Sequence, residues 1–136
     1  LPVRQFDQRW RYTERMAACL GADARVDPEH DPLRMLRQRV YGILAGYEDC
    51  NDHDALRDEP VFKLVAGGVP PDAEALASQP TLCRFENALL IPALHKLLGF
   101  LVRTGIERLK EAHGGTLNLA NRIDRSGSEA LLRLPL

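Results

Sequence analysis

The chain has 136 residues, 45% of them hydrophobic, and a formal net charge of −1 at pH 7. This length and composition predict one domain with a sizeable core. The near-neutral charge argues against a non-specific nucleic-acid coat, which needs a strongly positive face. Charge is uneven along the chain, however. Residues 49–60 hold five acidic residues and a single Arg, whereas residues 84–133 hold eight Lys or Arg against five Asp or Glu.

Compartment and membrane signals are few. The sequence contains three widely spaced cysteines, Cys19, Cys50 and Cys83, and no CxxC pair. This pattern favours a reduced, cytoplasmic location and argues against a zinc finger. The first twenty residues are rich in Arg, unlike a signal peptide, and the chain begins without Met. The longest apolar stretch, residues 88–102, includes a proline, a histidine and a lysine, so we expect no membrane contact.

The first half of the chain has a helical pattern. A first helix is predicted from Gln5 to Leu20, with Gly21 as its stop signal. A second begins at Asp31-Pro32, a cap followed by proline at the first helical position. Its apolar residues recur at helical spacing as one stripe: Leu33, Leu36, Val40, Ile43, Leu44 and Tyr47. Four residues are therefore expected to lie off the buried face: Arg34, Gln38, Tyr41 and Ala45.

Shorter elements follow. Residues 48–60 are predicted as an acidic loop with one turn at residues 54–56, and Pro60 opens a short helix through Ala66. A proline-containing linker at residues 69–72 precedes a helix that begins near Ser78. Pro92 separates that helix from a long one over residues 93–113.

The helical pattern fades beyond Thr116. Residues 116–119 are predicted as a short strand, and residues 129–134 as a stub of helix. The sequence therefore predicts an all-α, mainly helical fold, with room for a helix-turn-helix-like element and at most one short strand near the C-terminus. We divide it into a helical region, residues 1–115, and an irregular tail, residues 116–136.

No group of residues predicts a catalytic or metal site. Asn51-Asp52-His53-Asp54 contains metal-ligand residue types, but neighbours on one short loop seldom converge on one ion. Asp52 or Asp54 is instead expected to cap backbone N–H groups. Cys50 with His53 lacks a third member for nucleophilic catalysis. The remaining histidines are isolated: His30, His95 and His113. We expect no metal ligand, no catalytic residue and no small-molecule substrate.

Residues 76–87 have the chemistry of a helix that contacts DNA. Ser78 is a favoured N-cap, and Leu82, Phe85 and Leu89 define a buried face. Polar side chains near the start of a helix anchored by its other face suit a recognition helix, which reads base edges in the major groove. The predicted DNA contacts are Ser78, Gln79, Thr81 and Arg84, with Arg84 the best candidate. The alternative is an ordinary capped surface helix.

Three stretches, in this order and at this spacing, resemble the N-terminal region of bacterial insertion-sequence transposases of the DDE superfamily. They are LRQRVYGILAGYED (residues 36–49), NDHDALR (51–57) and LASQPTLCRFEN (76–87), with PVFKL (60–64) between the last two. The resemblance implies DNA transposition, with DNA at the element ends as the partner. It also implies a following RNase H-like domain, where three carboxylates hold two divalent metals that activate the attacking oxygen.

The tail departs from the family's pattern. The first carboxylate motif would fall near residues 116–120, where Asn118 and Ala120 stand in place of the acids, and Asp124 lacks the surrounding motif. Asn cannot supply the charge that a Mg²⁺ site needs. We therefore expect a truncated copy, inactive alone, that uses no cofactor itself, Mg²⁺ being a cofactor of full-length members only. Whether any enzymatic activity survives stays open.

A second hypothesis needs no DNA. The helices over residues 33–47 and 94–109 both carry long apolar stripes, and uncovered apolar patches drive association. The chain would then be a helical protein–protein or oligomerisation module. Its partner would be a second copy or the missing catalytic domain. Such association should depend on concentration and hardly on salt, unlike phosphate contacts.

Overall fold

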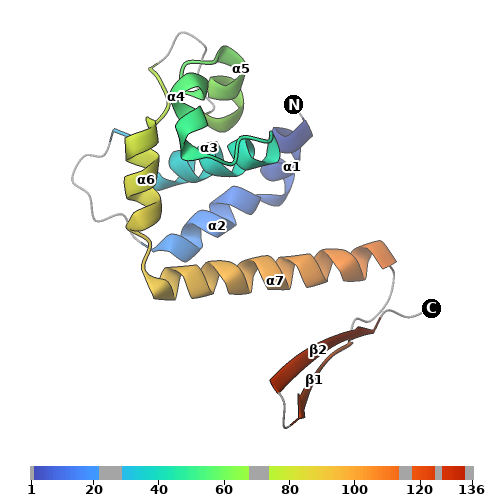
Figure 1. Cartoon of the computed structure of the whole chain (residues 1–136). Helices are drawn as coiled ribbons and strands as arrows, with labels where there is room; N and C mark the ends of the chain where they lie inside the picture. The colour runs from blue at the N-terminus through green and yellow to red at the C-terminus, as the bar shows by residue number, and fades with distance from the viewer. Residues whose placement is uncertain (1, 22–28, 68–73, 114–117, 125–126, 134–136) are drawn as a thin grey trace. The chain divides into compact units, whose positions relative to one another are not determined.

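The computed structural model describes residues 2–21, 29–67, 74–113, 118–124 and 127–133. They fall into two compact units, Leu1–Leu97 and Leu98–Leu136. The first unit is built from helices (Figure 1). In chain order its elements are α1 (Pro2–Trp10), α2 (Tyr12–Leu20), α3 (Pro32–Leu44), the 3₁₀ turn η1 (Cys50–Asp52), α4 (His53–Leu56), α5 (Pro60–Phe62), the π turn η2 (Lys63–Gly67), α6 (Gln79–Asn87) and the start of α7 (Ile91–His113). The predicted all-α class is confirmed.

The first predicted helix is broken in two. Arg11 lies between α1 and α2 in the left-handed region, with φ of 51°, which is uncommon for a residue other than glycine. Its side chain does not cap α2. The carboxylate of Asp7 does so instead, because it accepts from the backbone N–H of Thr13 at 2.7 Å and from the Thr13 hydroxyl at 2.5 Å. The continuous helix from Gln5 to Leu20 was therefore a wrong prediction.

Helix α3 begins as predicted but buries a different face. Asp31 accepts from the backbone N–H of Arg34 at 2.9 Å, and Pro32 occupies the first turn. The buried residues are Met35, Leu36, Gln38, Tyr41 and Gly42, whereas Ile43, Leu44 and Tyr47 are exposed. Gln38 and Tyr41 can be buried because both polar groups find partners in the fold. The apolar stripe was thus a poor guide to the core.

Two clusters of buried side chains connect α3 to later elements. Tyr41 packs with Phe62, Ala66 and Leu76, which joins α3 to α5, η2 and the chain before α6. A second cluster, Met35 with Ala77 and Leu82, joins α3 to α6 itself. The core of this unit therefore depends on α3, and the second cluster fixes the position of α6.

Gly42 allows the closest approach in this core. A Cβ at Gly42 would lie 2.7 Å from Cε1 and 2.9 Å from Nε2 of His53, whose side chain is fully buried. Alanine at an exposed helical site would gain about 1 kcal/mol of helix propensity. Overpacking costs roughly 1–3 kcal/mol, and here the clashing ring is fully buried.

We therefore expect Gly42→Ala to lower the free energy of unfolding by about 2 kcal/mol, measured by urea denaturation. The double variant Gly42→Ala/His53→Ala should lose less free energy of unfolding than the two single variants lose in sum, since the clash is then absent. Gly105→Ala is the matched control, because a Cβ there meets no atom within 4 Å. Equal stability of Gly42→Ala and Gly105→Ala would contradict the close packing.

The second unit contains the rest of α7 and a β-hairpin. β1 (Asn118–Asp124) pairs antiparallel with β2 (Gly127–Arg133), with Asn118 opposite Arg133 and Asp124 opposite Gly127. The helical stub predicted at residues 129–134 was wrong, because residues 129–133 belong to β2. A stub of one or two turns is too short to be stable alone, whereas paired strands satisfy each other's backbone groups. The division into a helical region, residues 1–115, and a tail, residues 116–136, stays a prediction. Residues 116 and 117 of the predicted strand lie outside the described residues.

Helix α7 is close to its prediction. It begins at Ile91, four residues after α6 ends at Asn87, and Pro92 lies in its first turn, where proline is tolerated. Among the described residues, no single helix is long and apolar enough to cross a membrane, although α6 and α7 taken together satisfy length and composition as a bent pair.

Candidate functional site

The chain leading into α6 is held by one buried amide. The side chain of Gln38, which has no exposed surface, donates from Nε2 to the carbonyl oxygen of Ala77 at 2.8 Å. The backbone N–H of Ala77 donates back to Oε1 of Gln38 at 3.1 Å. Leu82 is also fully buried and lies one turn into α6. These contacts fix the start of α6 on α3 and turn its opposite face outward.

The N-terminus of α6 is capped from another segment. Ser78 occupies the N-cap position, but its side chain makes no capping hydrogen bond, which corrects the prediction. Oδ1 of Asp54 instead accepts from the backbone N–H of Gln79 at 2.9 Å. Asp54 therefore caps as predicted, although across the fold and not within its own loop. Its negative charge at this end of α6 makes the helix start unfavourable for a phosphate.

The acidic loop contributes a buried histidine and no metal site. His53 is fully buried, and Nη1 of Arg39 lies 3.0 Å from its Nε2 atom. Burial, together with the Arg39 charge, lowers the pKa of His53. Arg39 also pairs with Glu86 of α6 at 2.5 Å. Within the described ranges, no group of three or more His, Cys, Asp or Glu side chains could hold a metal ion. His53 and Arg39 thus help to join α3, α4 and α6.

Three of the four predicted contact residues form a chain of polar contacts. Nη2 of Arg84 donates to Oγ1 of Thr81 at 3.3 Å, and that hydroxyl lies 3.1 Å from Oγ of Ser78. Gln79 is separate: its amide donates to the sulfur of Cys83 at 3.4 Å. Arg84 is exposed and the other three are partly buried. The sequence prediction placed these side chains on one outward face, and the structure links Ser78, Thr81 and Arg84 there.

A hollow of about 730 Å³ lies beside this face. Its lining includes Thr81, Arg84 and Phe85 of α6, the α6–α7 connection, Lys96 of α7 and the end of α2. Of the residues that the structure describes, the lining contains two cationic ones, Arg84 and Lys96, and no carboxylate. Neither cation has an ion pair with another described residue. Ser78 and Gln79 do not line the hollow.

Lys96 was missed by the sequence reasoning. It lies twelve residues beyond Arg84, on the next helix, inside the apolar stretch that was considered only as a possible membrane span. No local spacing predicts that it joins Arg84. In the described chain directly before α6, residues 74–78 are not helical, so no helix precedes α6 across a three- or four-residue turn within that stretch.

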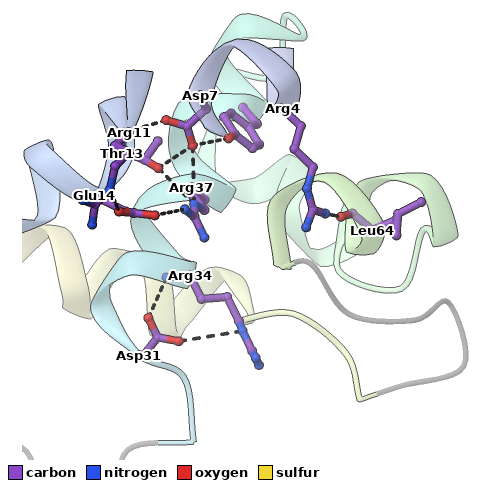
Figure 2. A network of polar contacts seen from close by, with 10 residues as sticks. Arg4, Asp7, Arg11, Thr13, Glu14, Asp31, Arg34, Arg37 and Leu64 are labelled. Carbon is purple, nitrogen blue, oxygen red and sulfur yellow. Dashed lines mark hydrogen bonds and ion pairs between the residues drawn. The ribbon is translucent and has the colours of Figure 1, made fainter. Parts of the chain in front are cut away.

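A second polar network surrounds Asp7 (Figure 2). Its buried carboxylate accepts from the hydroxyl of Tyr41 at 2.5 Å as well as from Thr13, and Nε of Arg37 lies 3.5 Å away. Burial alone would raise the pKa of Asp7, but the hydrogen bonds from Thr13 and Tyr41 and the Arg37 charge lower it. Arg37 also contacts Glu14 at 3.4 Å. The network joins α1, α2 and α3, and all its charges are satisfied internally, so it is structural.

Comparison with known proteins gives one match. The family model described as Transposase DDE domain group 1 matches residues 1–115, which include α1 to α7 and the residues that line the hollow. Searches of the curated proteins and of the solved structures found no match.

Proposed function

This chain belongs to the Transposase DDE domain group 1 family, and from that membership and the geometry of α6 we propose that its helical unit binds DNA through the hollow beside α6. The membership itself gives the chain a role related to transposition. The observation that carries the proposal is the pair of cations, Arg84 and Lys96, which among the described residues have no ion pair and share a hollow with no carboxylate.

The chemistry of this surface suits a DNA backbone. Guanidinium and ammonium groups bind phosphate oxygens, and the Thr81 hydroxyl can donate to the same oxygens. Asp54 at the start of α6 disfavours an anion there, so the phosphates would lie toward Arg84 and Lys96. Ser78 and Gln79 would then face a base edge or a sugar. We propose DNA of the element ends as the target.

We further propose that this chain does not catalyse strand transfer alone. Asn118 and Ala120 stand where the family resemblance implies carboxylates, and neither can supply negative charge to a divalent ion. Mg²⁺ would belong to a full-length member with its catalytic domain. DNA binding through Arg84 and Lys96 involves no metal ion, so a chelator should leave it unchanged.

The binding test uses fluorescence anisotropy with short duplexes at low salt, with EDTA present. We expect Arg84→Ala and Lys96→Ala each to weaken binding about fivefold to tenfold, because each removes one phosphate contact. Arg9→Ala is the charge-matched control: Arg9 is exposed, lies over the ring of Trp10 and is outside the hollow. The affinity of the Arg9→Ala variant for the duplex should stay close to that of the unaltered protein.

Equal losses in all three variants would show non-specific attraction and overturn the site. Absence of binding by the folded protein would favour the module without DNA binding. That alternative has one specific observation in its favour, the exposed side chains of Leu44 (65%), Leu90 (73%) and Ile91 (68%). Concentration-dependent sedimentation that is insensitive to salt would then identify self-association.

A further inference from the structure

Two cysteines from distant parts of the sequence lie close together where η1 packs on α6. Cys50 is the first residue of η1, and Cys83 follows the buried Leu82 on α6. The packing of η1 on α6 brings the Cys83 side chain close enough to Cys50 to raise the pKa of the Cys50 thiol. The Cys50 sulfur also lies 3.5 Å from Oε2 of Glu86, which is three residues beyond Cys83 and on the same helical face. Their meeting is therefore fixed by the packing of η1 on α6.

The surroundings hold this pair in place. Cys50 packs against the cluster of Met35, Ala77 and Leu82. Gln79 donates to the Cys83 sulfur at 3.4 Å. Both cysteines remain partly exposed, so a small oxidant can reach them. Cys19 has a different environment, with its thiol on the carbonyl oxygen of Arg15 at 3.4 Å.

We propose that Cys50 and Cys83 are a redox-sensitive pair that a hydroperoxide oxidises to an intramolecular disulfide. The thiolate of one cysteine attacks the peroxide oxygen, which breaks the O–O bond and gives a sulfenic acid and an alcohol. The second thiolate then attacks that sulfur, and the S–OH bond breaks with release of water. Two thiols lose two protons and two electrons, and the hydroperoxide accepts them. In a reducing compartment such a bond would be transient and responsive, not structural.

The expected rate depends on pH. Burial raises the pKa of the Cys50 thiol to about 11, with the Cys83 and Glu86 side chains acting in the same direction and Arg39 opposing them. Thiolate, not thiol, is the nucleophile. Disulfide formation should therefore be slow at neutral pH and rise about tenfold per pH unit below the Cys50 pKa, wherever attack by Cys50 limits the rate.

The test uses the full chain with Cys19→Ser, so that only the pair remains. Treatment with hydrogen peroxide should remove two hydrogen atoms from the mass of the monomer and block labelling by maleimide, and dithiothreitol should reverse both. The disulfide should also raise the melting temperature, because it constrains the unfolded chain across residues 50–83. The matched controls are Cys19→Ser/Cys83→Ser and Cys19→Ser/Cys50→Ser. They should show neither the loss of mass nor the rise in melting temperature.

Addition of oxygen atoms in place of the mass loss, or retention of both maleimide-reactive thiols, would overturn the proposal. Mass loss only in a covalent dimer would do so as well, because it would place the bond between chains. If one double variant fails to fold, the other still serves as the control. The mass of the oxidised Cys19→Ser protein shows whether the disulfide forms even without these two controls.

Discussion

Replacing Asp7 by alanine should lower the free energy of unfolding by about 3 kcal/mol, enough to unfold much of a marginally stable domain. The buried carboxylate accepts from the Thr13 N–H and hydroxyl and from the Tyr41 hydroxyl, and it faces Arg37 (Figure 2). Its removal leaves a partly buried guanidinium and a buried hydroxyl without this partner, and it removes the cap of α2. Chemical denaturation followed by circular dichroism measures the loss.

Glu14→Ala is the matched control for Asp7. Glu14 also contacts Arg37, at 3.4 Å, but its side chain is 35% exposed, so its loss should cost less than 1 kcal/mol. Equal losses in the two variants would show that Asp7 stabilises the fold only as one more surface charge, against the network described here.

The lowered pKa of Asp7 also predicts acid sensitivity. A carboxylate whose pKa is lower in the folded state than its usual value of 3.8 contributes stability fully above that value. The contribution is lost as pH falls through the folded-state pKa. Between pH 5 and pH 2, the unaltered protein should therefore lose more stability than Asp7→Asn, which keeps the shape without the charge. Parallel pH profiles would contradict the assignment.

Replacing Gln38 by alanine should cost about 3 kcal/mol, the second large effect. The substitution leaves the N–H and the carbonyl of Ala77 without this partner, at roughly 1–3 kcal/mol for each buried group that stays unsatisfied, and it opens a cavity in a fully buried position. Gln38→Met fills most of that volume without the hydrogen bonds, so it separates the two contributions. Urea denaturation of both variants gives the values.

The matched control for Gln38 is Gln5→Ala, on the exposed side of α1. It should change stability by less than about 0.5 kcal/mol, as most surface substitutions do. If Gln38→Ala is equally mild, then Ala77 is held by other contacts and the position of α6 does not depend on this amide.

Features encoded locally were predictable. The Asp31-Pro32 start of α3 and the separation of α6 from α7 near Pro92 depend on residues within one or two turns. The start of α6 after Ser78 was also placed correctly, although its cap comes from Asp54. The resemblance to DDE transposases was carried by short stretches at a set spacing, and the family match over residues 1–115 confirms it.

Features decided by distant partners were not predictable. Gln38 can be buried because the backbone of Ala77, 39 residues later, hydrogen-bonds to both the N–H and the oxygen of its side-chain amide. Tyr41 can be buried because Asp7 accepts a hydrogen bond from its hydroxyl. Ser78 does not cap α6: its hydroxyl lies 3.1 Å from that of Thr81, and the distant Asp54 accepts from the Gln79 N–H. In each case the residue type is compatible with either environment, and contacts with residues far away in the sequence determine which one is found. The same holds for Lys96, which joins Arg84 only through the arrangement of α6 and the first turns of α7.

The most direct test of DNA binding by the hollow is the salt dependence of duplex affinity. The logarithm of the association constant should fall linearly with the logarithm of salt concentration, because phosphate contacts release counterions. For the folded double variant Arg84→Ala/Lys96→Ala, the slope should be shallower by about 2, roughly one for each lost contact. An unchanged slope, or no duplex binding by the unaltered protein at low salt, would contradict the account.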